Sequence, residues 1–307
     1  MKRILYADIL RVLAIFAVII LHCVGYYCNM FKEISLFNWF FANSVDSLLR
    51  FCVPVFVMLS GMLLLGSEKE FNLRKRASRI VIPLICWSIV YIMAYWWNDH
   101  SVNILKSVVK IFRGPVAEHL WFPYMLFGLY LLTPLIKPFV KEKKNMHYIL
   151  ILLAIFSVIF PLIKNFTGFS FGVSLGFGEG YIGYYILGYY LHNYTTFLDN
   201  KKISIPLFIV AYLTTVIGTY FLTQNNNGVL GERFYSNFSP NVILTSVIMF
   251  MFIKNNANIF SKISTKFIEK IGEISYGVYL SHVLFVTFLF KTLYVLNPIV
   301  DMLTKSI

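Results

Sequence analysis

The feature that most constrains this chain is a series of nine apolar segments, each close to the length that crosses a bilayer. A transmembrane helix needs about 20 predominantly apolar residues. The sequence therefore predicts an all-α fold, a polytopic transmembrane bundle of about nine to ten helices in a single domain over residues 1–307. We expect the nine helices at about 6–28, 44–65, 77–97, 119–136, 147–164, 178–192, 203–223, 239–254 and 273–296.

The composition excludes an ordinary soluble domain. Apolar residues make up 58% of the chain and charged residues only 13%, whereas soluble domains carry roughly 25% charged residues. The net charge of +13 could indicate a nucleic-acid partner, but the basic residues lie in the gaps between apolar segments, as the positive-inside rule predicts. We therefore expect membrane lipids, and no nucleic acid, among the partners.

The distribution of basic residues predicts that the N-terminus is cytoplasmic. With that orientation the inside segments hold seventeen Lys and Arg residues and the outside segments hold seven. The first apolar segment resembles a signal peptide, but Asp8 and Arg11 lie in it and no small-residue cleavage site follows, so we expect a retained helix. The tail 297–307 is too short and too polar to cross again. Either the C-terminus is external, or a tenth helix is missing or truncated after residue 297.

The first predicted helix carries ionisable residues, which are costly inside a membrane and usually functional. Arg11 and His22 are eleven residues apart, so they share one helix face about 16 Å apart along the axis. Asp8 is one turn before Arg11 and is expected to pair with it. Histidine is the obvious general base near neutral pH. Two structural alternatives stay open, a snorkelling anchor for Arg11 and an interhelical hydrogen bond for His22.

Other polar residues of the apolar segments have simpler interpretations. Asp46 and Arg50 are four residues apart in the second predicted helix and favour a neutralised scaffold pair. The four cysteines lie in apolar segments without metal-ligand spacing, so we expect no disulfide framework and no metal site.

A basic segment precedes the third predicted helix and is expected to form a cytoplasmic loop. Four cations within six residues would suit a polyphosphate ligand, although a basic loop that only marks topology is the commoner case. The four candidates for binding a phosphorylated cofactor are Arg74, Lys75, Arg76 and Arg79.

Polar residues near the predicted outer ends and in the last helix are candidates for binding an acceptor substrate. They are surrounded by Tyr and Trp, which could equally form an interfacial aromatic belt. The candidates are Glu118, His119, Glu179 and His282.

Five motifs together resemble the membrane acyltransferases called acyltransferase 3. Arg11 followed after ten residues by His22 is similar to the signature of that family's first helix. The segment Pro54–Gly61 is similar to its second-helix signature, and Arg74–Pro83 to its basic loop leading to a proline. His119–Phe122 and Ser275–His282 also resemble family segments. The order and spacing of all five carry the resemblance, which spans most of the chain.

This resemblance implies ten helices and transfer of an acyl group, usually acetyl from acetyl-CoA, to hydroxyls of cell-surface glycans or lipids. It further implies acyl-CoA as donor, a glycan or lipid-linked saccharide as acceptor, and a multi-pass protein of a bacterial cytoplasmic membrane. Together with the residue chemistry, it predicts that His22 is the base or carries an acyl intermediate. Arg11 would line the donor path and the basic loop would hold the phosphates of CoA.

Two rival functions remain open at this point. A transporter or flippase also uses buried charges and broken helices, although no inverted repeat is obvious. A non-catalytic subunit for polysaccharide export would use the buried charges to hold helices together.

Overall fold

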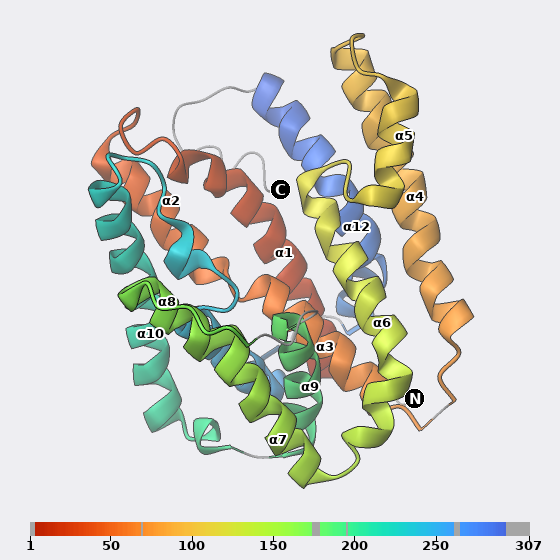
Figure 1. Cartoon of the computed structure of the whole chain (residues 1–307), viewed down its shortest axis with the longest axis vertical. Helices are drawn as coiled ribbons and strands as arrows, with labels where there is room; N and C mark the ends of the chain where they lie inside the picture. Colours follow the sequence, from red (N-terminus) through yellow and green to blue (C-terminus); the bar gives the residue numbers. More distant parts are fainter. Residues whose placement is uncertain (1–3, 69, 174–178, 195, 261–264, 293–307) are drawn as a thin grey trace.

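The computed structural model confirms the predicted all-α bundle (Figure 1). It describes residues 4–68, 70–173, 179–194, 196–260 and 265–292, and no strand occurs among them. The helices are α1 (Leu5–Cys28), α2 (Leu36–Leu49), α3 (Cys52–Leu65), α4 (Leu73–Asn98), α5 (Ile104–Arg113), α6 (Trp121–Phe139), α7 (Lys143–Ala154), α8 (Phe160–Thr167), α9 (Glu179–Asn193), α10 (Lys201–Asn225), α11 (Pro240–Asn255) and α12 (Thr265–Thr292).

Every predicted membrane segment contains a helix. Within the described residues, eight helical runs are long and apolar enough to cross a membrane. The remaining predicted segment, 178–192, corresponds to α9, which has only 15 residues. The prediction of a possible tenth helix concerns the chain after residue 297, which lies outside the described residues.

Several helices begin earlier in the chain than hydropathy predicts, because a polar side chain caps the N-terminus of each one. The side chains of Ser35, Asn72 and Asn103 each accept a hydrogen bond from the backbone N–H three residues later, at 3.2, 2.9 and 2.9 Å. Such a cap satisfies a backbone donor that the first turn leaves free. Asn72 therefore caps α4, which begins at Leu73, and Asn103 caps α5, a short helix outside the nine predicted segments.

The second predicted membrane helix is broken into α2 and α3. The break falls at Arg50 and Phe51, just before Pro54. A proline ring clashes with the carbonyl four residues earlier and donates no hydrogen bond, and that carbonyl belongs to Arg50. The kink permitted by Pro54 therefore sets the direction in which α3 enters the bundle.

Helices α3 and α9 approach each other closely because each presents a glycine to the other. A Cβ atom at Gly61 would lie 1.7 Å from the carbonyl oxygen of Tyr185, and one at Gly188 would lie 1.9 Å from that of Met58. Small residues allow helix backbones this close in membranes, where packing rather than hydrophobic burial drives association. This contact holds α3 at the centre of the bundle, beside α1 and α6.

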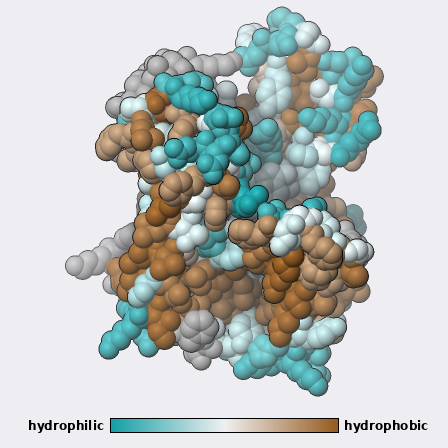
Figure 2. All heavy atoms as spheres, turned by 60° about the vertical axis from the view of Figure 1, so that its left-hand side comes forward, coloured by the Kyte–Doolittle hydropathy of each residue, from teal (hydrophilic) through white to brown (hydrophobic). Residues whose placement is uncertain are grey.

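The outer helices face lipid. The most hydrophobic stretch of α1 is 56% buried inside the protein, whereas that of the α7–α8 run is only 11% buried. On the face in Figure 2, hydrophobic side chains gather across the middle and lower parts of the molecule, with hydrophilic ones toward its two ends. This distribution suits a protein that spans a bilayer.

Candidate active site

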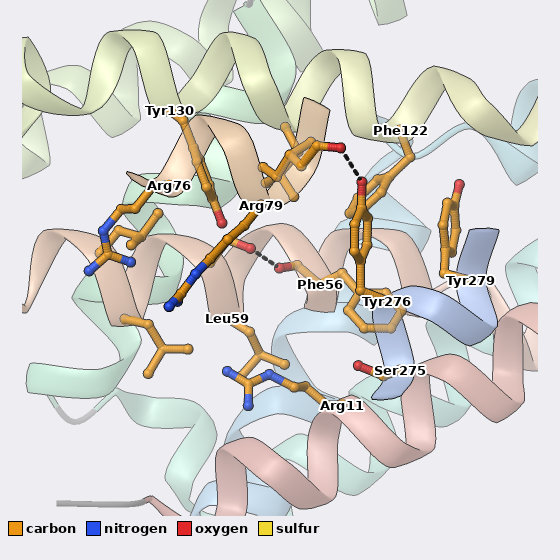
Figure 3. A pocket seen from close by; sticks show the side chains of 15 residues that line it. Arg11, Phe56, Leu59, Arg76, Arg79, Phe122, Tyr130, Ser275, Tyr276 and Tyr279 are labelled. Carbon is orange, nitrogen blue, oxygen red and sulfur yellow. Dashed lines mark hydrogen bonds between the residues drawn. The ribbon is translucent and has the colours of Figure 1, made fainter. Parts of the chain in front are cut away.

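A pocket of about 300 Å³ lies between α1, α3, α4, α6 and α12. Figure 3 shows the guanidinium groups of Arg11, Arg76 and Arg79 toward one end of it, and Tyr276, Tyr279 and Phe122 toward the other. Three guanidinium groups around one cavity form a site suited to phosphate or another anion, since each offers a planar set of N–H donors.

Arg11 is held at the pocket by an ion pair within α1. Its Nη1 atom lies 2.8 Å from Oδ1 of Asp8, so the pairing predicted from the sequence is present. Asp8 is nearly buried, while the Arg11 side chain keeps 29% of its surface exposed. The partly exposed guanidinium therefore has donors left for a ligand in the pocket.

The basic segment before the third predicted membrane helix is not a loop, which corrects that expectation. Because Asn72 caps α4, its cations lie in the first two turns of that helix. Arg76 and Arg79 are three residues apart, so they share a face and both line the pocket. Arg74 and Lys75 are exposed and are not among the lining residues. The structure thus brings two of the four predicted phosphate ligands to the cavity.

Three histidines predicted as site residues converge from separate parts of the chain. The ring centroids of His22 in α1 and His282 in α12 are 4.9 Å apart. His119, in the short 3-10 helix Glu118–Leu120 before α6, lies 5.2 Å from His282 and 6.4 Å from His22. His119 and His282 are buried and His22 is partly exposed, so a substrate would reach His22 most easily.

Backbone carbonyl groups fix the protonation of two of these rings. Nδ1 of His282 lies 2.6 Å from the carbonyl oxygen of Tyr279, and Nε2 of His119 lies 3.4 Å from that of Leu280. A carbonyl only accepts hydrogen bonds, so each of these nitrogens carries the proton and leaves a lone pair on the other nitrogen. For His282 the free nitrogen, Nε2, is buried without a hydrogen-bond partner in the described part of the chain.

An aromatic layer separates the histidine cluster from the arginine pocket. Tyr279 and Phe122 line the pocket, and their rings are 5.2 Å apart. Tyr279 also contacts the histidines, with its ring 5.6 Å from that of His282 and its hydroxyl donating to the carbonyl oxygen of His119 at 2.5 Å. One layer of side chains therefore lies between the cation-lined cavity and the imidazoles.

The tyrosines of the Ser275–His282 motif on α12 were not among the residues predicted for the site. Ser275 and Tyr279 are four residues apart on one helix face, and Tyr276 lies beside them; all three line the pocket. The four-residue spacing could have shown that Ser275 and Tyr279 share one helix face. It could not show that this face lines the pocket, because that depends on how α12 packs against the other helices.

The two acidic residues predicted to bind the acceptor are not seen among the three histidines. Glu118 precedes His119 directly but its side chain is exposed. Glu179 is the first residue of α9, and its side chain lies outside the described part of the structure. Both remain predictions.

A second polar network surrounds the break between α2 and α3. Asp46 is fully buried and pairs with Arg50. The Arg50 guanidinium stacks 3.9 Å from the ring centroid of Tyr235, whose hydroxyl donates to Oδ1 of Asn43 at 2.6 Å. These bonds tie α2 to the segment before α11, in agreement with the scaffold interpretation.

No group of three or more His, Cys, Asp or Glu side chains in the described residues has a geometry that would hold a metal ion. The four cysteines are free thiols.

The fold and site together define a helical membrane protein with an arginine-lined pocket beside a histidine cluster. Residues 4–304 match the acyltransferase domain of the acyltransferase 3 family. The chain belongs to this family and is a membrane acyltransferase. A protein of Acidianus two-tailed virus, titled "Putative acetyltransferase ORF330", is 25% identical over 252 residues, which cover 76% of this chain and 72% of the viral protein. No solved structure matches the chain.

Proposed function

We propose that this protein transfers an acyl group, with acetyl as the first candidate, from acyl-CoA to a hydroxyl group of a cell-surface glycan or a related acceptor. The observation that carries the proposal is the pocket of three arginines, which ends one side-chain layer from three histidines. The pocket suits the anionic end of the donor, and the imidazoles suit the proton transfer that acylation of a hydroxyl requires.

Acyl-CoA is the proposed donor because its phosphates complement the pocket. Arg11, Arg76 and Arg79 would bind phosphate oxygens, and Arg74 and Lys75 would attract the anion from the surface. The thioester would then extend past Tyr279 toward His22. Arg11 and His22 are about 16 Å apart along α1, so the donor has to be a long molecule with its charge at one end and its acyl group at the other.

His22 is the proposed base. It is the partly exposed member of the cluster, and its neighbours are neutral imidazoles rather than acids. His22 would remove the proton from the acceptor hydroxyl, whose oxygen attacks the thioester carbonyl. His119 and His282 would lie beside the acceptor, with Glu118 and Glu179 as further contacts at the same end of the protein.

The proposed location is the cytoplasmic membrane of a bacterium, with the N-terminus inside. The distribution of Lys and Arg supports this orientation. It would put the arginine end of the pocket toward cytoplasmic acyl-CoA and the histidines toward an external saccharide.

Purified protein in proteoliposomes with acetyl-labelled acetyl-CoA tests the proposal. We expect CoA release, with the label transferred to a saccharide acceptor or slowly hydrolysed. A protein that moves saccharide across the bilayer without consuming thioester would instead be a flippase, and one that does neither would be a non-catalytic subunit. Either of these outcomes would overturn the proposal.

A further inference from the structure

We infer that His282 is a positioning residue for His22, because its free Nε2 atom accepts the N–H of the His22 ring and thereby selects the His22 nitrogen that works as base. This inference rests on the proposed function and adds to it the way in which the base is oriented. It differs from the sequence-based expectation, in which His282 binds the acceptor substrate.

The first observation is that His282 is locked with its lone pair on Nε2. The Nδ1–H group donates to the carbonyl oxygen of Tyr279 at 2.6 Å, within one turn of α12. The side chain is buried, with 4% of the residue exposed, and Nε2 has no hydrogen-bond partner among the described residues. A buried polar atom without a partner is costly, so a native one calls for an explanation.

The second observation is that the ring next to this lone pair is His22. Two imidazoles joined by one N–H···N bond have centroids about 5 Å apart, since a bond of about 2.9 Å adds to roughly 1 Å within each ring. The measured separation of His22 and His282 is 4.9 Å. A rotation of the His22 ring about χ2, a torsion with broad minima in histidine, would align its N–H with Nε2.

The other groups around the pair do not replace this contact. His119 also has a lone pair, on Nδ1, but its ring centroid is 6.4 Å from that of His22, too far for the direct N–H···N bond that places centroids about 5 Å apart. Arg50, the cation of the polar network at the break between α2 and α3, carries only donors and is paired with Asp46. The Tyr279 hydroxyl donates to the carbonyl oxygen of His119. His282 is thus the member of this group that offers His22 a fixed acceptor.

The hydrogen bond would assist each proton transfer of the proposed reaction. The acceptor hydroxyl gives its proton to the free nitrogen of His22, and its oxygen forms a bond to the thioester carbonyl carbon. The tetrahedral intermediate collapses, the C–S bond breaks, and the CoA thiolate takes the proton back from His22. While His22 is an imidazolium, its second N–H remains bonded to His282, which stabilises the charge and keeps the ring in place.

Two amide substitutions of His282 distinguish a role in orienting the His22 ring from a role in packing alone. In His282→Asn the amide N–H₂ still reaches the Tyr279 carbonyl, but no atom replaces Nε2. In His282→Gln the longer side chain brings an acceptor oxygen to the place of Nε2. We expect His282→Asn to lower kcat about 10- to 100-fold, the effect of losing one hydrogen bond to a charged group, with KM for acetyl-CoA unchanged. His282→Gln should recover most of the loss.

The controls are His147→Asn, which changes an exposed histidine on α7 away from the cluster, and His22→Ala. Folding is checked by gel filtration and a thermal melt. Equal loss in both His282 variants, a loss confined to KM, or wild-type kcat in His282→Asn would overturn the inference. If His282→Asn is fully active while His22→Ala is inactive, only the orienting role fails. If His22→Ala also transfers normally, His22 is not the base and the proposed mechanism fails as well.

Discussion

Arg76 and Arg79 differ from Arg74 and Lys75 by position on one helix turn rather than by charge. The first pair lines the pocket and the second pair does not, although Arg79 is exposed like Arg74 and Lys75, and only Arg76 is half-buried. A cation in a partly enclosed cavity makes directed hydrogen bonds to a bound anion, whereas an exposed cation acts through solvent and is screened by salt. The four cations of this segment are therefore not equivalent.

We predict that the double variant Arg76→Gln, Arg79→Gln raises KM for acetyl-CoA by about 10- to 100-fold at physiological salt, since hydrogen bonds between charged groups are the strong ones. The matched control is Arg74→Gln, Lys75→Gln, which removes the same charge from the same two turns. It should change KM only a few-fold, and less at high salt. Equal effects in the two double variants would mean that net charge alone, and not the pocket, binds the donor.

At His22 we expect substitution by alanine to lower transfer by about 10²- to 10⁴-fold, the usual contribution of a general base. The amount of folded protein in the membrane should stay at the wild-type level, because the side chain is partly exposed and holds no helix end. Transfer of label from acetyl-CoA, normalised to folded protein, measures the effect. Unchanged transfer would show that His22 does not act on the proton.

The contact between α3 and α9 decides how the elements assemble. Met58, Gly61 and Gly188 bring the two backbones together, and α3 supplies one wall of the arginine pocket. A change on the far side of α3 therefore reaches the pocket through the position of the helix.

We predict that Gly188→Ala destabilises the bundle by about 1–3 kcal/mol, the usual cost of an added methyl group in a packed site. Its Cβ would clash with backbone atoms of Met58, which have no rotamer to move to. The matched control is Gly128→Ala on α6, where no atom lies within 4 Å of the added Cβ. Thermal melts in detergent compare the two, and an equal melting temperature for both variants would contradict the prediction.

Sequence patterns predicted the elements well and their arrangement only in part. Apolar segments of about 20 residues identify membrane helices because lipid requires that length. Hydropathy does not detect polar N-caps such as Asn72. The start of α4, and the fact that the basic residues of this segment are helical, were therefore not predicted. Arg11 and His22 were found by spacing on one helix. That His119 and His282 meet His22 depends on packing between segments far apart in the chain, which no local pattern contains.

At the scale of the whole molecule, the two ends of the bundle differ in chemistry. Arg11 lies toward the end where α1 begins, and His22 lies toward the end where it finishes. The proposed function requires these ends to face different compartments, so the orientation of the protein is as important as its fold.

Orientation is tested with single cysteines in a Cys86→Ala background, since Cys86 is the exposed native thiol. Lys106 on α5 and Lys144 on α7 are exposed and belong to segments predicted on opposite sides. We expect Lys106→Cys to react with a membrane-impermeant maleimide in intact cells, and Lys144→Cys to react only after permeabilisation. The reverse pattern would place the arginine pocket outside and rule out cytoplasmic acyl-CoA as donor.

The aromatic layer of Tyr279 and Phe122 has a consequence for the cell as well as for catalysis. An enzyme with a polar cavity on one side of a bilayer and basic imidazoles beyond it has most of the parts of a proton channel. Between those parts the described structure has rings 5.2 Å apart and a tyrosine hydroxyl bonded to a backbone carbonyl. In the proposed mechanism these side chains would separate the two polar sites, so that an acyl group would be passed along while the membrane keeps its electrochemical gradient.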